Sequence, residues 1–197
     1  MGFAVLGGPG LQSKIKGFEP EILNALNEAA NKVKNGQAST ECQRWFGDAS
    51  SGFASRLEKV LRQFCSIINT QKISVNFASL KDRDRYENAA AYSPKSGWDE
   101  YINMTKVQGQ ELTMHINEAF ARLPIYCNPD PATTVGQSQF ETVVHELSHL
   151  ILNTDDIVHN GNTAYGATAA RNLAAADANN AKKNAENWGL FVEEFKL

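Results

Sequence analysis

The residues with the clearest chemistry form the run His145-Glu146-Leu147-Ser148-His149, which has the pattern H-E-x-x-H. On a helix, residues four apart lie one turn above each other on the same face. Two imidazoles in that arrangement can bind one zinc ion, with Zn–N distances of about 2.0–2.1 Å. The spacing therefore predicts that His145 and His149 are metal ligands on a helix.

Glu146 is rotated about 100° from His145 around the helix axis, so it flanks a bound metal rather than binding it. From there it can reach a water molecule at the zinc, which lowers the pKa of that water to about 7. The arrangement predicts metal-assisted hydrolysis with Glu146 as the general base. The simpler alternative is two helix histidines with core hydrogen bonds. A structural zinc is disfavoured, because such sites bind four protein ligands and favour cysteine.

A catalytic zinc needs a third protein ligand, which the residues alone do not single out. The longer pattern H-E-x-x-H-x-x-G-x-x-H is absent, because Leu152 and Asp155 occupy its last glycine and histidine positions. The open candidates are acidic or polar residues downstream of the motif: Asp155, Asp156, His159, Asn162, Glu186 and Glu193.

The segment after the motif resembles the aspzincin metallopeptidases, the family of deuterolysin and the peptidyl-Lys metalloendopeptidases. Members carry H-E-x-x-H followed by G-T-x-D-x-x-Y-G, and this chain has Asn153-Thr154-Asp155-Asp156 and then Tyr165-Gly166. The stretch 184–191 also resembles the family pattern N-A-D-x-x-x-x-F. The resemblance implies one catalytic Zn²⁺ with Asp156 as the third ligand and Asp155 as the runner-up.

Two departures from the family pattern affect this assignment. Asn153 stands where the family has glycine, and Tyr165 follows Asp156 after nine positions rather than three, as though Ile157 to Asn162 were inserted. Counted back rigidly from Tyr165-Gly166, the ligand position would be Asn162, a poorer zinc ligand.

The resemblance also implies roles for two further residues. Tyr165 corresponds to the tyrosine whose hydroxyl faces the scissile carbonyl, where a phenol donates a hydrogen bond that strengthens as charge develops. Glu186 corresponds to an aspartate bordering the pocket for the residue after the cut, and a carboxylate there favours Lys or Arg. Lysine-selective members add a second acidic group where this chain has Gly189, so we expect a broader, basic-leaning preference. The simpler alternatives are a packing tyrosine and a solvated helix carboxylate.

The surrounding sequence predicts the elements that position these residues. Ser138 to Glu141 has the S-x-x-E form of a capping box. Apolar residues then follow helical spacing, so one face of this helix is core: Phe140, Val144, Leu147 and Ile151. We also expect an Ala-rich helix over about 167–188, a helix starting at Pro20, a second one over about 53–68, strands near 73–78, 89–92 and 112–117, and a loop at 95–110.

Helices, a small sheet and helices again predict an α+β fold. With the resemblance, the expectation is a zincin-like domain whose helices flank a small, mostly antiparallel sheet, with H-E-x-x-H on the active-site helix. The length of 197 residues suits a single domain over 1–197. Its parts are an N-terminal helical part at about 18–70, the sheet at about 73–120 and the catalytic helices at about 138–197.

The composition narrows the classes of partner and leaves the location open. A net charge of −3 gives no reason to expect nucleic acid, and no apolar run is long enough to span a membrane. The apolar start lacks the basic n-region of a secretory signal, so we expect a secreted form or an effector delivered by special machinery, with a cytoplasmic enzyme as the alternative. The three cysteines allow one disulfide or three buried thiols: Cys42, Cys65 and Cys127.

The predicted function is that of a zinc-dependent endopeptidase, a monomer acting on peptides or proteins, with a toxin role and an immunity or inhibitor protein as open extensions. The alternative from another class is a non-catalytic zinc-binding scaffold or toxin module on the same fold. A zinc hydrolase of non-peptide amides is a third reading. Three protein ligands beside an open position favour an enzyme, and four protein ligands favour the scaffold.

Overall fold

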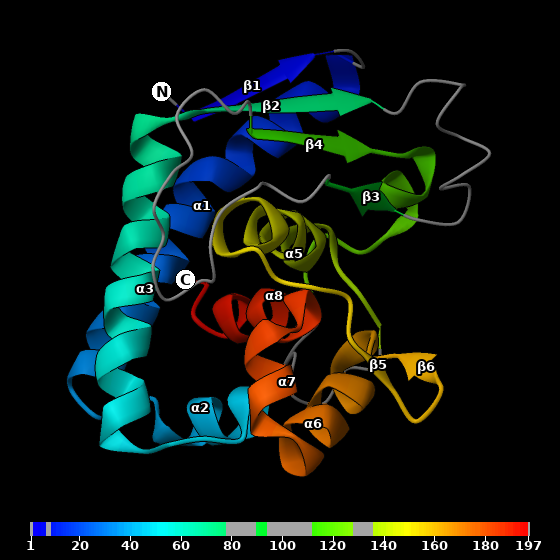
Figure 1. The fold of residues 1–197 in the computed structure, drawn as a ribbon. Helices are drawn as coiled ribbons and strands as arrows, with labels where there is room; N and C mark the ends of the chain where they lie inside the picture. The colour runs from blue at the N-terminus through cyan, green and yellow to red at the C-terminus, as the bar shows by residue number, and fades with distance from the viewer. Residues whose placement is uncertain (1, 7–8, 78–89, 94–111, 128–135, 197) are drawn as a thin grey trace.

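The computed structural model describes residues 2–6, 9–77, 90–93, 112–127 and 136–196 (Figure 1). The expected loop at 95–110 lies outside these residues. A four-stranded sheet has the strand order β1-β2-β4-β3. Its strands are β1 (Gly2–Leu6), β2 (Lys72–Phe77), β3 (Ala91–Tyr92) and β4 (Leu112–Ile116). A short 3₁₀ helix, Glu118–Arg122, follows β4.

The directions of the strands differ from the expected, mostly antiparallel sheet. β1 and β4 both pair with β2 in parallel, and only β3 pairs antiparallel with its neighbour β4. The three helices between β1 and β2 explain the first parallel pair, because a crossover of that kind returns the chain to the same end of the sheet. β1 was not predicted at all. Its five residues lack two-residue alternation, and they become a strand through pairing, with Phe3 opposite Ile73.

Three helices form the N-terminal part: α1 (Pro9–Lys34), α2 (Ser39–Phe46) and α3 (Ser51–Thr70). The expected start of α1 at Pro20 is wrong, because the helix begins at Pro9 and Pro20 lies inside it. A proline inside a helix costs about 3 kcal/mol. Ile15 and Phe18, both almost fully buried, continue the apolar stripe toward the N-terminus, and burying such side chains contributes about 1.5–3 kcal/mol each. The packing therefore offsets the proline.

The C-terminal part consists of α5 (Gln139–Leu152), α6 (Gly166–Ala176), α7 (Ala178–Lys183) and α8 (Ala185–Glu193). α5 lies between the sheet and α8 (Figure 1). The expected single helix over 167–188 is wrong, because Asp177 and Asn184 interrupt it. The Asp177 carboxylate accepts hydrogen bonds from the backbone N–H groups of Asn179 and Asn180 and so starts a new helix.

The expected capping box at the start of α5 is only half formed. The Ser138 hydroxyl accepts a hydrogen bond from the backbone N–H of Glu141 at 2.9 Å. The Glu141 carboxylate does not complete the box, because neither of its oxygens has a hydrogen-bond partner among the described residues. The helix start is therefore capped by the serine alone.

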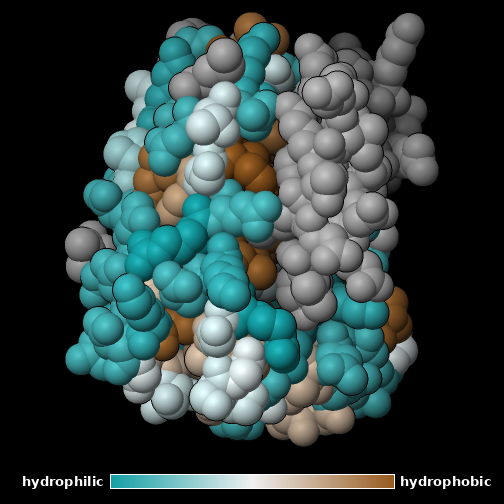
Figure 2. All heavy atoms as spheres, turned by 60° about the vertical axis from the view of Figure 1, so that its left-hand side comes forward, coloured by the Kyte–Doolittle hydropathy of each residue, from teal (hydrophilic) through white to brown (hydrophobic). Residues whose placement is uncertain are grey.

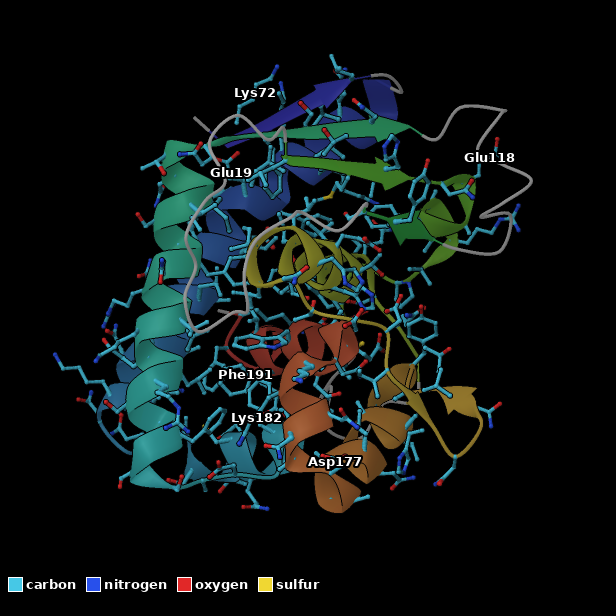
Figure 3. All side chains as sticks on the ribbon, viewed as in Figure 1. Glu19, Lys72, Glu118, Asp177, Lys182 and Phe191 are labelled. Atoms are coloured by element: carbon cyan, nitrogen blue, oxygen red, sulfur yellow. The ribbon has the colours of Figure 1, made fainter. Side chains whose placement is uncertain are left out.

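An aromatic cluster holds α8 in place below α5. Phe46 lies 5.5 Å from Phe53 and 5.0 Å from both Trp188 and Phe191, measured between ring centroids. Figure 3 shows Phe191 among the packed helices. Contacts of this kind add about 0.5–1.5 kcal/mol per pair to the burial itself. The cluster thus fixes the helix that carries Glu186.

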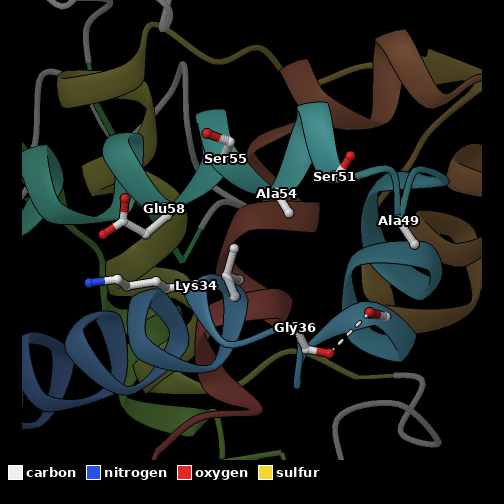
Figure 4. A pocket seen from close by; sticks show the side chains of 9 residues that line it. Lys34, Gly36, Ala49, Ser51, Ala54, Ser55 and Glu58 are labelled. Atoms are coloured by element: carbon white, nitrogen blue, oxygen red, sulfur yellow. Dashed lines mark hydrogen bonds between the residues drawn. The ribbon is translucent and has the colours of Figure 1, made fainter.

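The face that carries α3 is mostly hydrophilic, with hydrophobic atoms visible in the hollows between polar side chains (Figure 2). One hollow of about 370 Å³ lies between the end of α1 and the start of α3, with Lys34 and Glu58 among its lining residues (Figure 4). The other lining residues are small, and the Ser39 hydroxyl there donates to the carbonyl of Gly36 at 3.3 Å.

Candidate active site and metal centre

α5 places its two histidines side by side. Their Nε2 atoms are 3.1 Å apart and both residues are buried, with exposed fractions of 5% for His145 and 7% for His149. The apolar stripe expected on the other side of the helix is fully buried: Phe140, Val144, Leu147 and Ile151. The helix therefore presents both imidazoles to the same point in space.

The third member of the group comes from the segment that follows α5. The Oδ1 atom of Asp156 lies 3.1 Å from Nε2 of His145 and 3.5 Å from Nε2 of His149. Tetrahedral ligands at about 2.0–2.1 Å from zinc are about 3.3 Å from one another, so these three atoms fit one zinc ion. Burial by itself would raise the pKa of the Asp156 carboxyl group. Hydrogen bonds with the two histidines have the larger effect and hold this pKa well below the ordinary value. Asp155 is not in the group, and its backbone pairs with Lys183 and Ala185.

Asn153 explains how the chain turns toward Asp156 without the glycine of the family pattern. It ends α5 in the left-handed conformation, with φ 55° and ψ 37°. Asparagine is one of the few residues besides glycine that adopt this conformation at a helix end. The turn also brings the carbonyl oxygen of Thr154 to 2.8 Å from Nδ1 of His149. That hydrogen bond orients the ring so that Nε2 faces Asp156.

The extra residues between Asp156 and Tyr165 form a hairpin. Its strands are β5 (Val158–His159) and β6 (Asn162–Thr163), which pair antiparallel around the turn Asn160-Gly161. Both turn residues have positive φ, 52° and 81°, as a two-residue hairpin turn requires. The hairpin returns the chain to its starting point, where the N–H of Ala164 donates to the carbonyl of Ile157 at 2.8 Å. His159 and Asn162 belong to this hairpin. Among the described residues, His159 is not part of the group formed by His145, His149 and Asp156.

Glu186 supports the first histidine from α8. It is fully buried, and its Oε2 lies 3.2 Å from Nδ1 of His145. Its Oε1 accepts a hydrogen bond from the backbone N–H of Gly166 at 2.6 Å, which the glycine directs inward with a φ of 79°. A carboxylate on the far nitrogen of a ligand histidine fixes the ring and raises its basicity. The sequence did not reveal this contact, and the predicted contact of Glu186 with substrate stays a prediction.

A cavity of about 150 Å³ opens beside His145. It is lined by Ala90, Ala91, Gln137, Thr142, His145, Glu146 and Tyr165. Glu146 is 4% exposed, and its Oε2 has no hydrogen-bond partner within the described part of the chain. Burial raises the pKa of Glu146, against the opposing effect of the two histidines. The Tyr165 ring is 5.9 Å from that of His145, and burial together with the Asp156 charge raises the pKa of its phenol.

The sequence of this chain matches a known family of metallopeptidases. The model of the aspzincin family, described as lysine-specific metallo-endopeptidase, matches residues 31–193. This chain belongs to the aspzincin family. The aspzincin chain is also 43% identical over 62 residues to an extracellular protease of Aeromonas hydrophila. That match covers 30% of this chain and spans only 16% of the length of the relative.

A solved structure shares the fold. The zinc peptidase from Grifola frondosa matches with a TM-score of 0.50 and 21% identity, over 89% of this chain and 93% of the other. At that identity the likeness establishes the fold alone. It confirms the predicted α+β, zincin-like class, although the four-stranded sheet is mostly parallel rather than antiparallel.

Two further expectations concern the cysteines and the membrane. All three cysteines are buried free thiols, and burial raises the pKa of Cys42 and of Cys127 to about 12. The alternative of three buried thiols therefore describes the structure, and the thiolate form of these two residues is disfavoured. Among the helices that the structure describes, none combines the length and apolarity needed to cross a bilayer.

Proposed function

We propose that this aspzincin hydrolyses internal peptide bonds with one zinc ion held by His145, His149 and Asp156. The observation that carries the proposal is the triangle of three ligand atoms, 3.1–3.5 Å apart, at the edge of a cavity that also contains Glu146. The group has three protein ligands among the described residues, which leaves a fourth position for water or substrate. This favours the enzyme over the zinc scaffold.

The side chains divide the chemistry between them. Zinc, when bound, supplies the Lewis acidity that polarises the scissile carbonyl and acidifies a water molecule. Glu146 takes the proton of the attacking water and passes it to the leaving amine, and its burial supports this role because a carboxylate with a raised pKa holds a proton more readily. Tyr165, whose phenol is protonated at neutral pH, donates a hydrogen bond to the oxyanion that develops on the carbonyl.

The substrate class and the place of action extend the proposal. The substrate is a peptide or protein, and the family description supports a preference for basic residues next to the cut. Since the relative from Aeromonas hydrophila is an extracellular protease, we propose that this chain also acts outside the cell. Its delivery as an effector, its action as a monomer and an immunity or inhibitor partner stay predictions.

Two substitutions test the proposal on the zinc-loaded chain. Glu146→Gln should keep zinc and fold while the rate of casein hydrolysis falls by about 10²–10⁴-fold, the usual contribution of a general base. His149→Ala should lose both the metal and the activity. Zinc content is measured by atomic absorption and activity by release of peptides, with chelator-treated enzyme as the blank. Full activity in Glu146→Gln, or unchanged zinc affinity in His149→Ala, would contradict the assignment.

A further inference from the structure

The β5–β6 hairpin lies between two residues of the candidate site. β5 begins two residues after Asp156, and β6 ends two residues before Tyr165. Figure 1 shows the hairpin projecting beside α6. Because both of its ends are at the metal centre, its surface lies next to any peptide that binds there.

Asn184 holds the base of the hairpin. Its Oδ1 accepts a hydrogen bond from the N–H of Ile157 at 3.0 Å, and its amide nitrogen donates to the carbonyl of Ala164 at 3.3 Å. Asn184 is fully buried, and Ile157 and Ala164 pack in an apolar cluster with side chains of α6 and α7. The base of the hairpin is therefore fixed relative to Asp156 and Tyr165.

The two faces of the hairpin have different surroundings. In a strand, successive side chains point to opposite faces. The side chains of Ile157 and Ala164 pack against α6 and α7. Val158 and Thr163, which are cross-strand partners, therefore lie on the other face. The two-residue period also places Val158 on the same face as Asp156, about 6.5 Å further along the chain.

This outer face continues the apolar surface of the candidate site. Val158 and Tyr165 are two of the four exposed large hydrophobic side chains among the described residues, with exposed fractions of 65% and 47%. Tyr165 also lines the cavity beside His145, whose volume of about 150 Å³ is room for roughly five groups of the size of water. A bound peptide therefore continues past the cavity over the neighbouring surface. Residues 157–164 contain no Asp, Glu, Lys or Arg, so this surface suits an apolar side chain better than a charged one.

We propose that Val158 is a specificity-determining residue: it contacts an apolar side chain of the substrate, two or three residues from the scissile bond. The position follows from strand geometry, because about 6.5 Å along an extended peptide corresponds to two residues. The proposal rests on the proposed peptidase function. It gives a role to the inserted residues 157–162, which the sequence pattern left without one.

The test uses peptides with one cleavage site, which is located by mass spectrometry of a casein digest. Leucine and serine are compared in turn at the second and third positions on either side of the cut. At one of these positions, the zinc-loaded wild-type chain should cleave the leucine peptide with the higher kcat/KM. Val158→Ser should lower that leucine-to-serine ratio about fourfold, the effect of losing one buried methylene contact. Zinc content, measured in parallel, should not change.

Leu6→Ser is the matched control. Leu6 is 60% exposed, close to the value for Val158, and β1 lies at the opposite end of the molecule from the hairpin in Figure 1. This variant should keep the ratio. Equal cleavage of every leucine and serine pair by the wild-type chain overturns the inference. An unchanged ratio in Val158→Ser, or the same loss in Leu6→Ser, overturns it too. If the wild-type chain does not cleave casein, the proposed function itself fails.

Discussion

Replacing Glu186 with glutamine should weaken zinc binding while a matched change elsewhere does not. The carboxylate uses both oxygens, one for the N–H of Gly166 at 2.6 Å and one for Nδ1 of His145 at 3.2 Å. Glutamine has one acceptor oxygen, so one buried N–H group loses its partner, which costs about 1–3 kcal/mol in the free energy of unfolding. His145 also loses the charge that makes its other nitrogen a better ligand. Changes behind a ligand histidine reduce metal affinity by about 10–100-fold, or about 1.4–2.7 kcal/mol.

Two measurements on the full chain separate these effects. Competition with a coloured chelator gives the Kd for zinc, and urea unfolding of the zinc-free chain gives the free energy of unfolding. Glu193→Gln serves as control, because Glu193 also accepts from two donors, the N–H of Cys127 at 2.7 Å and the hydroxyl of Ser138. It should lose similar stability and keep its zinc affinity. Unchanged zinc affinity in Glu186→Gln would refute the reasoning, and an equal loss in both variants would mean that general loosening explains the effect.

Two other predictions concern the fold around the site. Asn153→Ala should lower the free energy of unfolding by about 1–2 kcal/mol, because a φ of 55° is unfavourable for alanine, whereas Asn153→Gly should leave it nearly unchanged; urea unfolding that gave equal values would contradict this. At Asp48, burial opposes ionisation, but the hydrogen bond from Lys182, whose Nζ is 2.7 Å away, and those from Ser50 lower its pKa from 3.8 to about 2. Since the pKa in the folded state lies below that in the unfolded state, this pair stabilises the fold above about pH 4 and the contribution disappears as the pH falls through about 2. Asp48→Asn should therefore cost about 1 kcal/mol near pH 7, after allowance for partial exposure, and the cost should shrink toward zero below pH 2; a cost independent of pH would argue against the ion pair.

The sequence was sufficient for the elements whose signals are local. α5 was predicted from its capping serine and its apolar period, and β2 and β4 from their alternation, because a strand or helix with one buried face shows its period directly. The strand directions were wrong because they depend on where the crossover helices return the chain. The start of α1 was wrong because a local proline rule was outweighed by the burial of Ile15 and Phe18.

In the candidate site, too, the local pattern was predictable and the longer-range arrangement was not. The spacing of H-E-x-x-H was enough to predict that two imidazoles lie together, since one helical turn fixes their separation. The loop that follows left several alternatives open. Its hairpin was nevertheless readable, because Asn160-Gly161 between two short polar segments is a strong signal for a two-residue turn. Recognising that turn would have removed the inserted residues from the count between Asp156 and Tyr165.

The contacts behind the histidines could not be predicted, because they join residues far apart in the chain. Glu186 reaches His145 from another helix, and Gly166 reaches Glu186 from a third. The S-x-x-E pattern at the start of α5 was misleading in an instructive way. Its serine caps the helix, while its glutamate turns toward α8, where Gly189 leaves space for it. Because the serine alone caps the helix, the S-x-x-E pattern does not determine where the glutamate side chain lies.

This division has a consequence for the chemistry of the site. The atoms that face the metal are fixed mainly by one helix and its C-terminal turn, whereas the groups behind His145 depend on the packing of α5 against α8. Substitutions in the aromatic cluster that holds α8, such as Phe191→Leu, should therefore disturb Glu186 and Glu141 before they disturb the spacing of His145 and His149. Zinc affinity should then fall while the chain still binds zinc, because the imidazole pair is built into a single helix, whereas the carboxylate of Glu186 that supports His145 comes from another helix.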